Sequence, residues 1–491
     1  MHYFVLLDIK IILFLVIIAS IPFHVGAVSS MKKSNLKNVS HNLGQSINQK
    51  IATTLDGHVY LVWSDTNEST EYSQIYFSKS NDFGKIFSEP LSISNQTGNA
   101  NLPVVMATGN RVYIAWEDNS GSDSIILFRK SSDFGNTFGK ILTLSRPTID
   151  ARFLSLSANE NNVYAVWRAA EAKAPKNFEI FFRKSMDYGE SFENIVNLSN
   201  SPGDSLDPQI TIPKNHPNYL YVSWSDCIEK NDNPFCSIYF AKSIDNGLTF
   251  GTPAFVSKFT SAVHTPLIGD QKSKLLSNVL PPKVTNADTH QTFHNSINPQ
   301  IISSKDGKYV YILWEDDFTP SGLSDIFIKK SHNYGESFDD PINLSKSMGI
   351  SRIVKSTATG NNLYIIWADT NSTSGNFNIF YKRVTENGKI IGDTLKISKT
   401  LETSIPADIA VSNDLRNVYV VWSESKINQF DIFSSKSNDG GITFSTPMNL
   451  SLTNGNSVDP TVSINPATNS IGIAWCEDVS SNHDIYYLTV S

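Results

Sequence analysis

The chain has 491 residues, of which 18% are charged and 40% are hydrophobic, and its formal net charge at pH 7 is -7. This mildly acidic balance offers no general attraction to nucleic acid or to anionic membranes, so neither is expected as a partner. The length does not set a domain count, because all-β rings can be this long as single units.

The first 27 residues are typical of a secretory signal peptide. Lys10 precedes an apolar run from Ile11 to Ile21, and the small residues before and at Ala27 suit signal peptidase. An uncleaved N-terminal anchor helix is the alternative. Residues 28–34 then form a short linker. In both cases we expect the body of the protein outside the cytoplasm, secreted or at the cell surface, with no membrane span once a signal is cleaved.

Eight segments share one pattern, in which a run of β-branched and aromatic residues ends in tryptophan. They are "VYLVWSD", "VYIAWED", "VYAVWRA", "LYVSWSD", "VYILWED", "LYIIWAD", "VYVVWSE" and "IGIAWCE", with Trp63, Trp116, Trp167, Trp224, Trp314, Trp367, Trp422 and Trp475. Most units carry three further apolar runs separated by Gly, Asn, Asp and Pro, which predicts four strands, A to D, with the tryptophan on B. These runs are apolar on both faces, so each sheet must be covered on both sides. The sequence predicts an all-β fold over residues 35–491, an eight-bladed β-propeller of four-stranded antiparallel blades, with seven blades as the alternative.

The two ends of the chain indicate how this ring closes. The last unit stops after "HDIYYLTVS", which supplies strand C but no strand D. Residues 35–40, "NLKNVS", resemble the strand D segments "PMNLS" and "NIVNLS" and stand ahead of the first strand A. We therefore expect the N-terminal segment to supply the missing strand and to leave no open sheet edge.

A short turn recurs six times between strands C and D. Its copies are "SNDFGKIF", "SSDFGNTF", "SMDYGESF", "SIDNGLTF", "SHNYGESF" and "SNDGGITF", with the paired residues Asp82 and Gly84, Asp133 and Gly135, Asp187 and Gly189, Asp245 and Gly247, Asn333 and Gly335, and Asp439 and Gly441. The Asp or Asn can accept backbone N–H groups, the Gly tolerates positive φ, and the Phe can anchor the turn. The pattern resembles the Asp-box, or BNR, repeat of the sialidase-type β-propellers. That resemblance implies a structural role on the periphery, away from the functional face.

Acidic residues recur on both sides of the connection between strands B and C. After tryptophan they are Asp65, Glu117, Asp118, Asp226, Glu315, Asp316, Asp369, Glu424, Glu477 and Asp478; near the start of strand C they are Glu179, Asp325, Asp431 and Asp484. One interpretation is a carboxylate-lined mouth that binds a cation or a polyhydroxylated ligand. The other interpretation is that these acids clasp the B–C hairpin of each unit. Their recurrence at the same place in the repeat favours it.

Residues 258–292 form an insertion between the fourth and fifth units. Long insertions at a binding face can be lids or ligand loops, and a solvated excursion is the alternative. His264, His290, His294 and Asp288 have metal-capable side chains, but a polar, Pro-containing loop does not fix their geometry. No metal site and no cofactor is therefore predicted.

The three cysteines fit an oxidising compartment. Cys227 and Cys236 flank a polar loop between two predicted strands, where a cross-hairpin disulfide can form. Cys476 follows Trp475 inside an apolar strand, which indicates a buried thiol. Asn-x-Ser/Thr sequons permit glycosylation of an exported chain at Asn38, Asn67, Asn95, Asn197, Asn343, Asn371 and Asn449, although three of them belong to a repeated "NLS" that repetition alone explains.

Arginine placement separates two functional hypotheses. The sialidase resemblance implies three arginines that hold a substrate carboxylate, a Tyr/Glu nucleophile and an Asp acid/base. Arg152, Arg168 and Arg352 are the candidates for the arginines, with ordinary pairing to carboxylates as the alternative. The family's Arg-Ile-Pro signature is met only by "SRIV", with Val354 in the place of Pro, and no Tyr/Glu pair can be assigned.

Our first hypothesis is an exported, monomeric, non-catalytic propeller. It recognises a glycan, a protein or a cell-surface component through the face that carries the B-to-C and D-to-A connections. The second hypothesis is a sialidase-like glycoside hydrolase that uses the three arginines.

Overall fold

The computed structural model describes residues 36–490 except for the following: 42–43, 68–69, 95–97, 122, 147–149, 160, 171–176, 231–232, 258–293, 320–321, 371–374, 386–388, 401, 427–428, 452, 454, 466 and 480–481. The predicted signal peptide, linker and insertion lie outside the described residues. Leu36–Ser491 belong to one compact unit. Within the described part of that unit, no helix is long and apolar enough to cross a membrane.

The strands follow the four-strand order expected from the repeats. Strands A are β2 (Gln45–Thr53), β6 (Ala100–Thr108), β10 (Asp150–Asn159), β14 (Asp204–Thr211), β18 (Ser296–Ser303), β22 (Ser351–Thr359), β26 (Ser404–Val411) and β30 (Asn456–Ile464). Strands B are β3 (Val59–Thr66), β7 (Arg111–Asp118), β11 (Asn162–Ala170), β15 (Leu220–Lys230), β19 (Val310–Asp316), β23 (Asn362–Asp369), β27 (Val418–Lys426) and β31 (Ile471–Val479).

The outer two strands of each unit complete the sheets. Strands C are β4 (Ser73–Ser80), β8 (Ile125–Ser131), β12 (Phe178–Ser185), β16 (Asn233–Ser243), β20 (Asp325–Ser331), β24 (Asn378–Val384), β28 (Gln429–Ser437) and β32 (Asn482–Val490). Strands D are β5 (Leu91–Ser92), β9 (Leu142–Thr143), β13 (Val196–Asn197), β17 (Ala254–Phe255), β21 (Ile342–Asn343), β25 (Ile390–Lys396), β29 (Met448–Asn449) and β1 (Leu36–Asn38).

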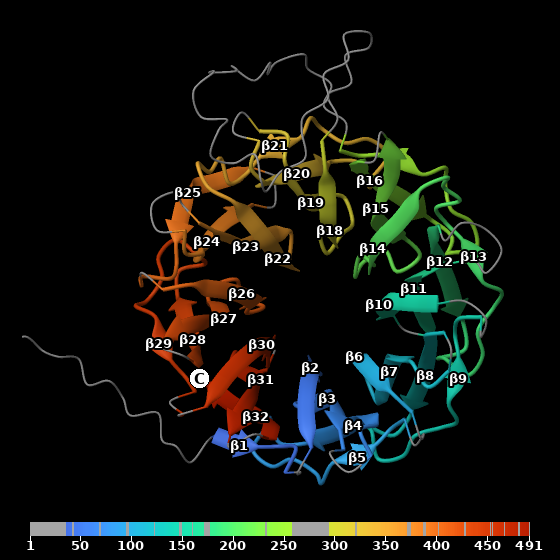
Figure 1. Cartoon of the computed structure of the whole chain (residues 1–491), viewed down its shortest axis with the longest axis vertical. Coiled ribbons are helices and arrows are strands. Elements are labelled where there is room, and N and C mark those ends of the chain that lie inside the picture. The colour runs from blue at the N-terminus through green and yellow to red at the C-terminus, as the bar shows by residue number, and fades with distance from the viewer. Residues whose placement is uncertain are drawn as a thin grey trace, which may run out of the picture. The chain divides into compact units, whose positions relative to one another are not determined.

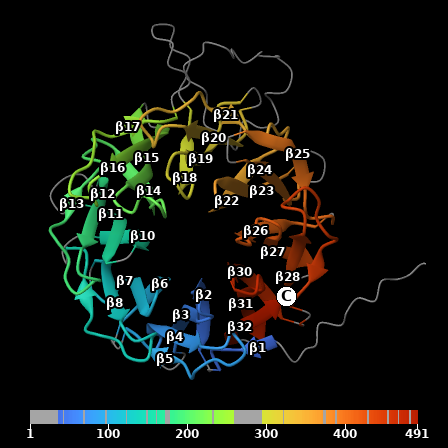
Figure 2. The ribbon, with the colours of Figure 1, turned by 180° about the vertical axis from the view of Figure 1, so that it is seen from behind.

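These strands build a ring of antiparallel sheets. Six units are separate four-stranded sheets, and the first and last units are joined into one eight-stranded sheet, so the described residues contain eight four-stranded blades. Each strand A contacts strand A of the next blade, and β30 contacts β2, so the innermost strands close the ring (Figure 1). The view from behind shows the same order, with the D strands at the rim (Figure 2). The prediction of an all-β propeller is confirmed.

The hydrophobic core lies between neighbouring blades. All eight tryptophans are fully buried, and the clusters that contain seven of them combine strands of two adjacent blades. Trp167, for example, packs with Tyr113 and Phe128 of the preceding blade and Phe181 of its own. This arrangement explains why the strand B runs are apolar on both faces, because each sheet has a neighbour on either side.

The N-terminal strand closes the ring as predicted. β1 pairs antiparallel with β32, with Leu36 opposite Leu488 and Asn38 opposite Tyr486. The N–H of Val39 donates to the carbonyl oxygen of Ile485 at 2.7 Å. The last blade is thus completed by the first segment of the described chain, which removes an exposed sheet edge.

Antiparallel order puts the connections on two opposite faces. The A-to-B and C-to-D connections share one face, named here the C–D face, and the B-to-C and D-to-A connections share the other, named the B–C face. The six recurrent turns therefore lie on the C–D face.

Candidate functional site

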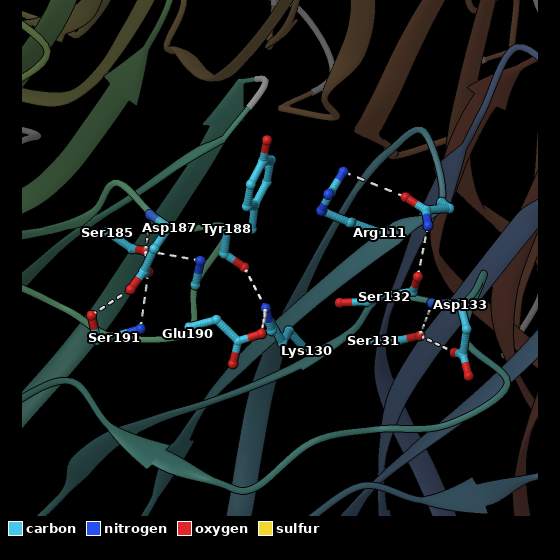
Figure 3. Close-up of polar contacts among 12 residues, drawn as sticks. Arg111, Lys130, Ser131, Ser132, Asp133, Ser185, Asp187, Tyr188, Glu190 and Ser191 are labelled. Atoms are coloured by element: carbon cyan, nitrogen blue, oxygen red, sulfur yellow. Dashed lines mark hydrogen bonds and ion pairs between the residues drawn. The ribbon is translucent and has the colours of Figure 1, made fainter.

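The recurrent turns use their polar groups internally. In blade 2 the Ser131 hydroxyl donates to Asp133 at 2.7 Å (Figure 3). The Gly135 N–H donates to Ser131 Oγ at 2.8 Å. The Thr137 N–H donates to Asp133 at 2.9 Å, and the Thr137 hydroxyl and N–H together lower the pKa of Asp133 to about 2. Gly135 has a φ of 75°, in the left-handed region that favours glycine. These contacts account for the Ser, Asp and Gly of the motif without any ligand.

The turns also join neighbouring blades. Lys130 of blade 2 donates to the carbonyl oxygen of Tyr188 at 3.0 Å and pairs with Glu190 at 2.5 Å, both in the turn of blade 3 (Figure 3). The Phe at the end of that turn, Phe192, packs edge-on against Phe128 of blade 2 at 5.0 Å. In blade 6 the turn pattern is absent, and strand D, β25, is seven residues long instead of two or three.

Substitutions in the turn of blade 3 should distinguish the role of Asp187, which accepts hydrogen bonds, from that of Gly189, which adopts a positive φ. Asp187→Asn should change the free energy of unfolding by less than about 0.5 kcal/mol, because Asn333 makes the corresponding bond to the Ser337 N–H at 3.0 Å. Gly189→Ala should cost about 2 kcal/mol, since φ is 76° and a Cβ would lie 2.9 Å from Phe128 Cζ. Urea unfolding of both variants measures the difference; equal costs would contradict this assignment.

The acids two positions after tryptophan clasp strands A and B. In six blades this carboxylate accepts the hydroxyl of the serine directly opposite on strand A, at 2.5 to 3.1 Å. The pairs are Ser46 with Asp65, Ser205 with Asp226, Ser296 with Asp316, Ser351 with Asp369, Ser404 with Glu424, and Ser457 with Glu477. For these acids the structure shows the clasp rather than the ligand-binding mouth.

The strand C acids hold strand D in a similar way. Asn38, Asn343 and Asn449 donate their side-chain N–H to Asp484, Asp325 and Asp431 at 2.8, 2.6 and 2.8 Å. Ser40, Ser345 and Ser451, the third residues of the same sequons, donate their hydroxyls to the same carboxylates. Strand D thus uses the Asn and Ser of these sequons to bind strand C.

One register position departs from the repeat. It is the residue directly after tryptophan, together with its partner on strand A. In blades 1, 4, 7 and 8 an aliphatic residue faces Ser or Cys: Ile47 with Ser64, Leu206 with Ser225, Ile405 with Ser423, and Val458 with Cys476. In blades 2, 3, 5 and 6 the pair carries charge: Asn101 with Glu117, Arg152 with Arg168, Ile297 with Glu315, and Arg352 with Ala368.

A residue that the fold itself requires would recur in every blade, whereas the residues at this register position differ between blades. The charged side chains occupy the same place in successive blades and therefore lie at one level of the ring. Asp207 adds a carboxylate at this level in blade 4, directly after Leu206. We name Glu117, Arg152, Arg168, Asp207, Glu315 and Arg352 the charged arc.

A β-bulge follows this position in strand A and shapes the arc. The register between β10 and β11 shifts after Arg152, and Phe153 has a φ of 56°. Ile353 has the same φ at the same place in blade 6, and positive φ is rare for a β-branched residue. Glu117 accepts the N–H of Phe153 at 2.6 Å, and Glu315 accepts the N–H of Ile353 at 2.9 Å. The two buried glutamates therefore hold the bulge of the next blade.

Arg168 is held by aromatic rings rather than by a salt bridge. Its guanidinium carbon lies 4.0 Å from the centre of the Phe153 ring and 4.7 Å from that of Phe178. Its buried Nε has no hydrogen-bond partner among the described residues. Arg152 stands directly opposite on β10 and donates from Nε to Asp150 at 2.9 Å. Facing like charges and an unsatisfied buried donor both cost stability, which points to a role other than folding.

Burial also perturbs the carboxylates of the arc. Glu117 and Glu315 are 4% and 3% exposed, and burial raises the pKa of each, opposed by the backbone hydrogen bonds and by nearby arginines. Burial raises the pKa of Asp207 as well, while Arg168 acts to lower it. The arc therefore combines always-charged guanidinium groups with carboxyl groups whose protonated form is favoured more than in water.

More charge lies directly after the bulge on the same inner strands. Burial raises the pKa of Asp408 in blade 7. The Val462 N–H, which donates to Asp408 at 2.9 Å, and the charge of Lys355 in blade 6 act against this rise. Burial, and then the charge of Lys355, lowers the pKa of Lys50 in blade 1. Residues of three blades therefore interact along the inner wall of the ring beyond the arc.

The structure places the three predicted arginines at the same level of the ring, two of them in blade 3 and one in blade 6. Arg152 and Arg168 are directly opposed in blade 3, and Arg352 stands at the position of Arg152 three blades further on. Asp207 and Phe153 were missed, because their contribution depends on the bulge. Glu117 and Glu315 were grouped with the clasp acids, although they follow tryptophan by one residue and the clasp acids by two.

The cysteine predictions are confirmed. Cys227 and Cys236 form a disulfide across the β15–β16 hairpin. Cys476 is buried, its thiol donates to the carbonyl oxygen of Ser46 at 3.3 Å, and burial raises its pKa to about 12.

Of the metal-capable residues, His264, His290 and Asp288 lie outside the described part; within it, no three His, Cys, Asp or Glu side chains gather as metal ligands.

His294 forms a buried ion pair near the arc. Nδ1 lies 3.0 Å from Asp316 Oδ1, and the imidazole is 12% exposed. Gly44, Gly98, Gly203, Gly349 and Gly455 hold the corresponding place in other blades; a Cβ at Gly44 would lie 2.2 Å from Asp65 Oδ1. Burial alone would lower the pKa of His294, but the hydrogen bond and charge of Asp316, with Asp317 behind it, raise it above the usual value.

His294→Gln should therefore lower stability in a pH-dependent manner. A raised pKa in the folded state means that the contribution is complete below the unfolded pKa of about 6.5 and is lost as pH rises through the folded value. The difference in urea midpoint between wild type and variant should be larger at about pH 5.5 than at about pH 9. A difference that is equal at both, or larger at the higher pH, would rule out this linkage.

Comparisons with known proteins concern the fold. No family model matches the chain, and no curated protein matches it. Among solved structures, polysaccharide lyase Uly1 is 11% identical with a TM-score of 0.48, covering 79% of this chain and 89% of that one. An ulvan lyase of polysaccharide lyase family PL25 is 11% identical with a TM-score of 0.46, covering 93% of both chains. A subtype N10 neuraminidase-like protein of A/little yellow-shouldered bat/Guatemala/060/2010 is 10% identical with a TM-score of 0.37, covering 70% of this chain and 96% of that one.

The fold and the site together define a class. The chain is a β-propeller with a charged arc on its inner strands.

Proposed function

We propose that the protein is a binding module that recognises an acidic glycan at the charged arc. The observation that carries this proposal is the register position after tryptophan, which holds charge in blades 2, 3, 5 and 6 and small or apolar residues in the other four. Glu117 and Glu315 hold the bulge of the next blade. The other blades fold without an arginine at this position, so a ligand is the better reason for Arg152, Arg168 and Arg352.

The side chains suit a sugar that carries carboxylate groups. The guanidinium groups of Arg152, Arg168 and Arg352 can each donate two parallel hydrogen bonds to a carboxylate. Phe153 is 45% exposed and offers an apolar face against which a sugar ring can pack. Asp207 can accept hydrogen bonds from sugar hydroxyls, as carboxylates at binding sites commonly do.

The Asp-box family, export and glycosylation remain part of the proposal. The Gly-to-Ser bonds of the six turns, with the Ser-to-Asp bonds of five of them and the Ser331-to-Asn333 bond of the sixth, support the Asp-box resemblance. The disulfide supports folding in an oxidising compartment, and hence a secreted or cell-surface protein. We expect Asn38, Asn343 and Asn449 to remain unmodified, because their side-chain N–H groups already bind carboxylates of strand C.

Titration of the full chain with an oligoglucuronide tests the proposal. We expect saturable binding that weakens as salt rises, because the contacts are between charges. The same oligosaccharide with its carboxylates reduced to alcohols is the matched ligand and should bind at least about tenfold more weakly. Equal binding of the two, or no binding of either, would contradict the proposal.

A sialidase-like glycoside hydrolase is the second candidate. The raised pKa values of Glu117 and Glu315 favour it, because a buried protonated carboxyl can serve as a general acid. Against it, both carboxylates bind backbone N–H groups, and the arc contains no tyrosine. A panel of fluorogenic glycosides, sialosides included, decides between the two. Turnover that Glu117→Gln or Glu315→Gln reduces at least about 100-fold would establish the hydrolase.

A further inference from the structure

The β-bulge of strand A recurs around the ring, but the type of residue that forms it changes. Seven blades have a residue of positive φ at this place. In four of them it is Asn or Asp, the side chains that tolerate the left-handed region best after glycine: Asn48, Asp207, Asn298 and Asp459. In blades 2, 3 and 6 it is apolar: Leu102, Phe153 and Ile353, with φ of 51°, 56° and 56°. We name these three the apolar bulge residues.

The apolar bulge residues are disfavoured in two ways. A positive φ strains a side chain that branches or is bulky, and their side chains are 44%, 45% and 40% exposed, so burial does little to offset that strain. Asn or Asp at the same place, as in the other four blades, avoids both costs. Backbone strain that the fold can avoid is commonly retained where a protein binds a ligand.

The apolar bulge residues stand beside the charged arc. Phe153 directly follows Arg152, and Ile353 directly follows Arg352. Leu102 lies on β6, whose neighbour among the innermost strands is β10, which carries Phe153 (Figure 1). In blades 3 and 6 a guanidinium that can bind a sugar carboxylate is therefore followed at once by an exposed apolar side chain.

Leu102 and Ile353 restrict the chemistry of what can bind against them. Neither side chain offers a hydrogen bond, so a sugar hydroxyl placed there loses water without gaining a partner. A methyl group placed there leaves water with a gain in free energy. Phe153 can pack against the ring of any sugar, so the two aliphatic residues are the ones that discriminate.

We propose that Leu102 and Ile353 are specificity-determining residues that bind the methyl groups of an acidic glycan. In such a glycan a methyl-bearing sugar stands next to the sugar that carries the carboxylate. The methyl group belongs either to a 6-deoxy sugar or to an acetyl substituent, and the contact with the aliphatic side chain is the same. This inference rests on the proposed binding of an acidic glycan at the charged arc, and it adds which sugars that glycan contains.

Calorimetric titration of the full chain with three matched tetrasaccharides tests the inference. Each alternates glucuronate with a second sugar, which is L-rhamnose, L-mannose (the same sugar with a hydroxyl on its sixth carbon) or L-mannose acetylated at that hydroxyl. At least one methyl-bearing ligand should bind about fourfold or more tighter than the mannose ligand, the gain expected from burying one methyl group. Whether the rhamnose or the acetylated ligand gains identifies the source of the methyl group.

The outcomes distinguish this inference from the proposed function. Equal affinity for all three ligands would overturn the inference and leave acidic-glycan binding in place. No binding of any of them would overturn both.

The double variant Leu102→Asn/Ile353→Asn separates binding from folding. At Leu102 it restores the Asn-Pro pair that Asn298 and Pro299 form at the bulge of blade 5. We expect the urea midpoint to stay equal or to rise, because asparagine tolerates positive φ, and the preference for methyl-bearing ligands to disappear.

Leu91→Asn is the matched control, since Leu91 is 45% exposed on β5 at the rim of the ring. This variant should keep the preference for methyl-bearing ligands. If the double variant kept the preference, or if its urea midpoint fell below that of Leu91→Asn, the apolar bulge residues would serve the fold and the inference would be overturned.

Discussion

Val39→Asp should destabilise the protein by about 4 kcal/mol or more, because it places an unpaired carboxylate in a closed interior site. Val39 is 2% exposed and packs among the side chains between the last and first blades, including Trp63 and Tyr487. The same substitution displaces β1 from β32 and reopens the sheet edge of the last blade. Urea unfolding monitored by tryptophan fluorescence measures the loss.

Val196→Asp is the matched control, since Val196 is a valine of strand D in blade 3, β13, and is 42% exposed, whereas Val39 directly follows strand D of the last blade, β1, and is buried. We expect that variant to lie within about 0.5 kcal/mol of the wild type. If both variants lost the same stability, or if Val39→Asp unfolded like the wild type, ring closure by the N-terminal strand would not contribute as described.

The double variant Arg152→Ala/Arg352→Ala should weaken oligoglucuronide binding at least about 100-fold, because each guanidinium supplies charge-assisted hydrogen bonds worth roughly 1.5–3 kcal/mol. The two residues occupy the same register position in blades 3 and 6, so the double variant removes charge from both ends of the arginine set. Calorimetric titration of the variant against the wild type measures the effect.

Arg416→Ala is the control for loss of positive charge alone, because Arg416 lies on the C–D face, away from the arc. Its affinity for the oligoglucuronide should stay within about threefold of the wild type. Should the double variant bind as tightly as Arg416→Ala, the arginines of the arc would not be the binding residues.

The fold was predictable from sequence because the evidence for it is repeated. All eight tryptophans are fully buried, so the same apolar pattern is required eight times. The closing strand was also predictable: "NVS" at residues 38–40 copies the "NLS" of other strands D, and its Asn and Ser bind Asp484 as theirs bind Asp325 and Asp431.

The site was only partly predictable, because it depends on which way each side chain points. Glu117 and Asp118 are neighbours in sequence, yet successive strand residues face opposite sides of the sheet. Glu117 therefore reaches the bulge of the next blade, whereas Asp118 stands opposite Ala100 at the clasp position. Aligning the eight units on tryptophan would have separated these two columns. The place of Asp207 in the charged arc depends on the β-bulge, and neither composition nor residue spacing predicts a bulge.

The most decisive test of glycan binding at the charged arc is a crystal structure of the protein soaked with an oligoglucuronide. We expect a sugar carboxylate within hydrogen-bond distance of at least one guanidinium among Arg152, Arg168 and Arg352, with a sugar ring against Phe153. An oligosaccharide bound elsewhere on the ring, with the charged arc unchanged, would contradict it.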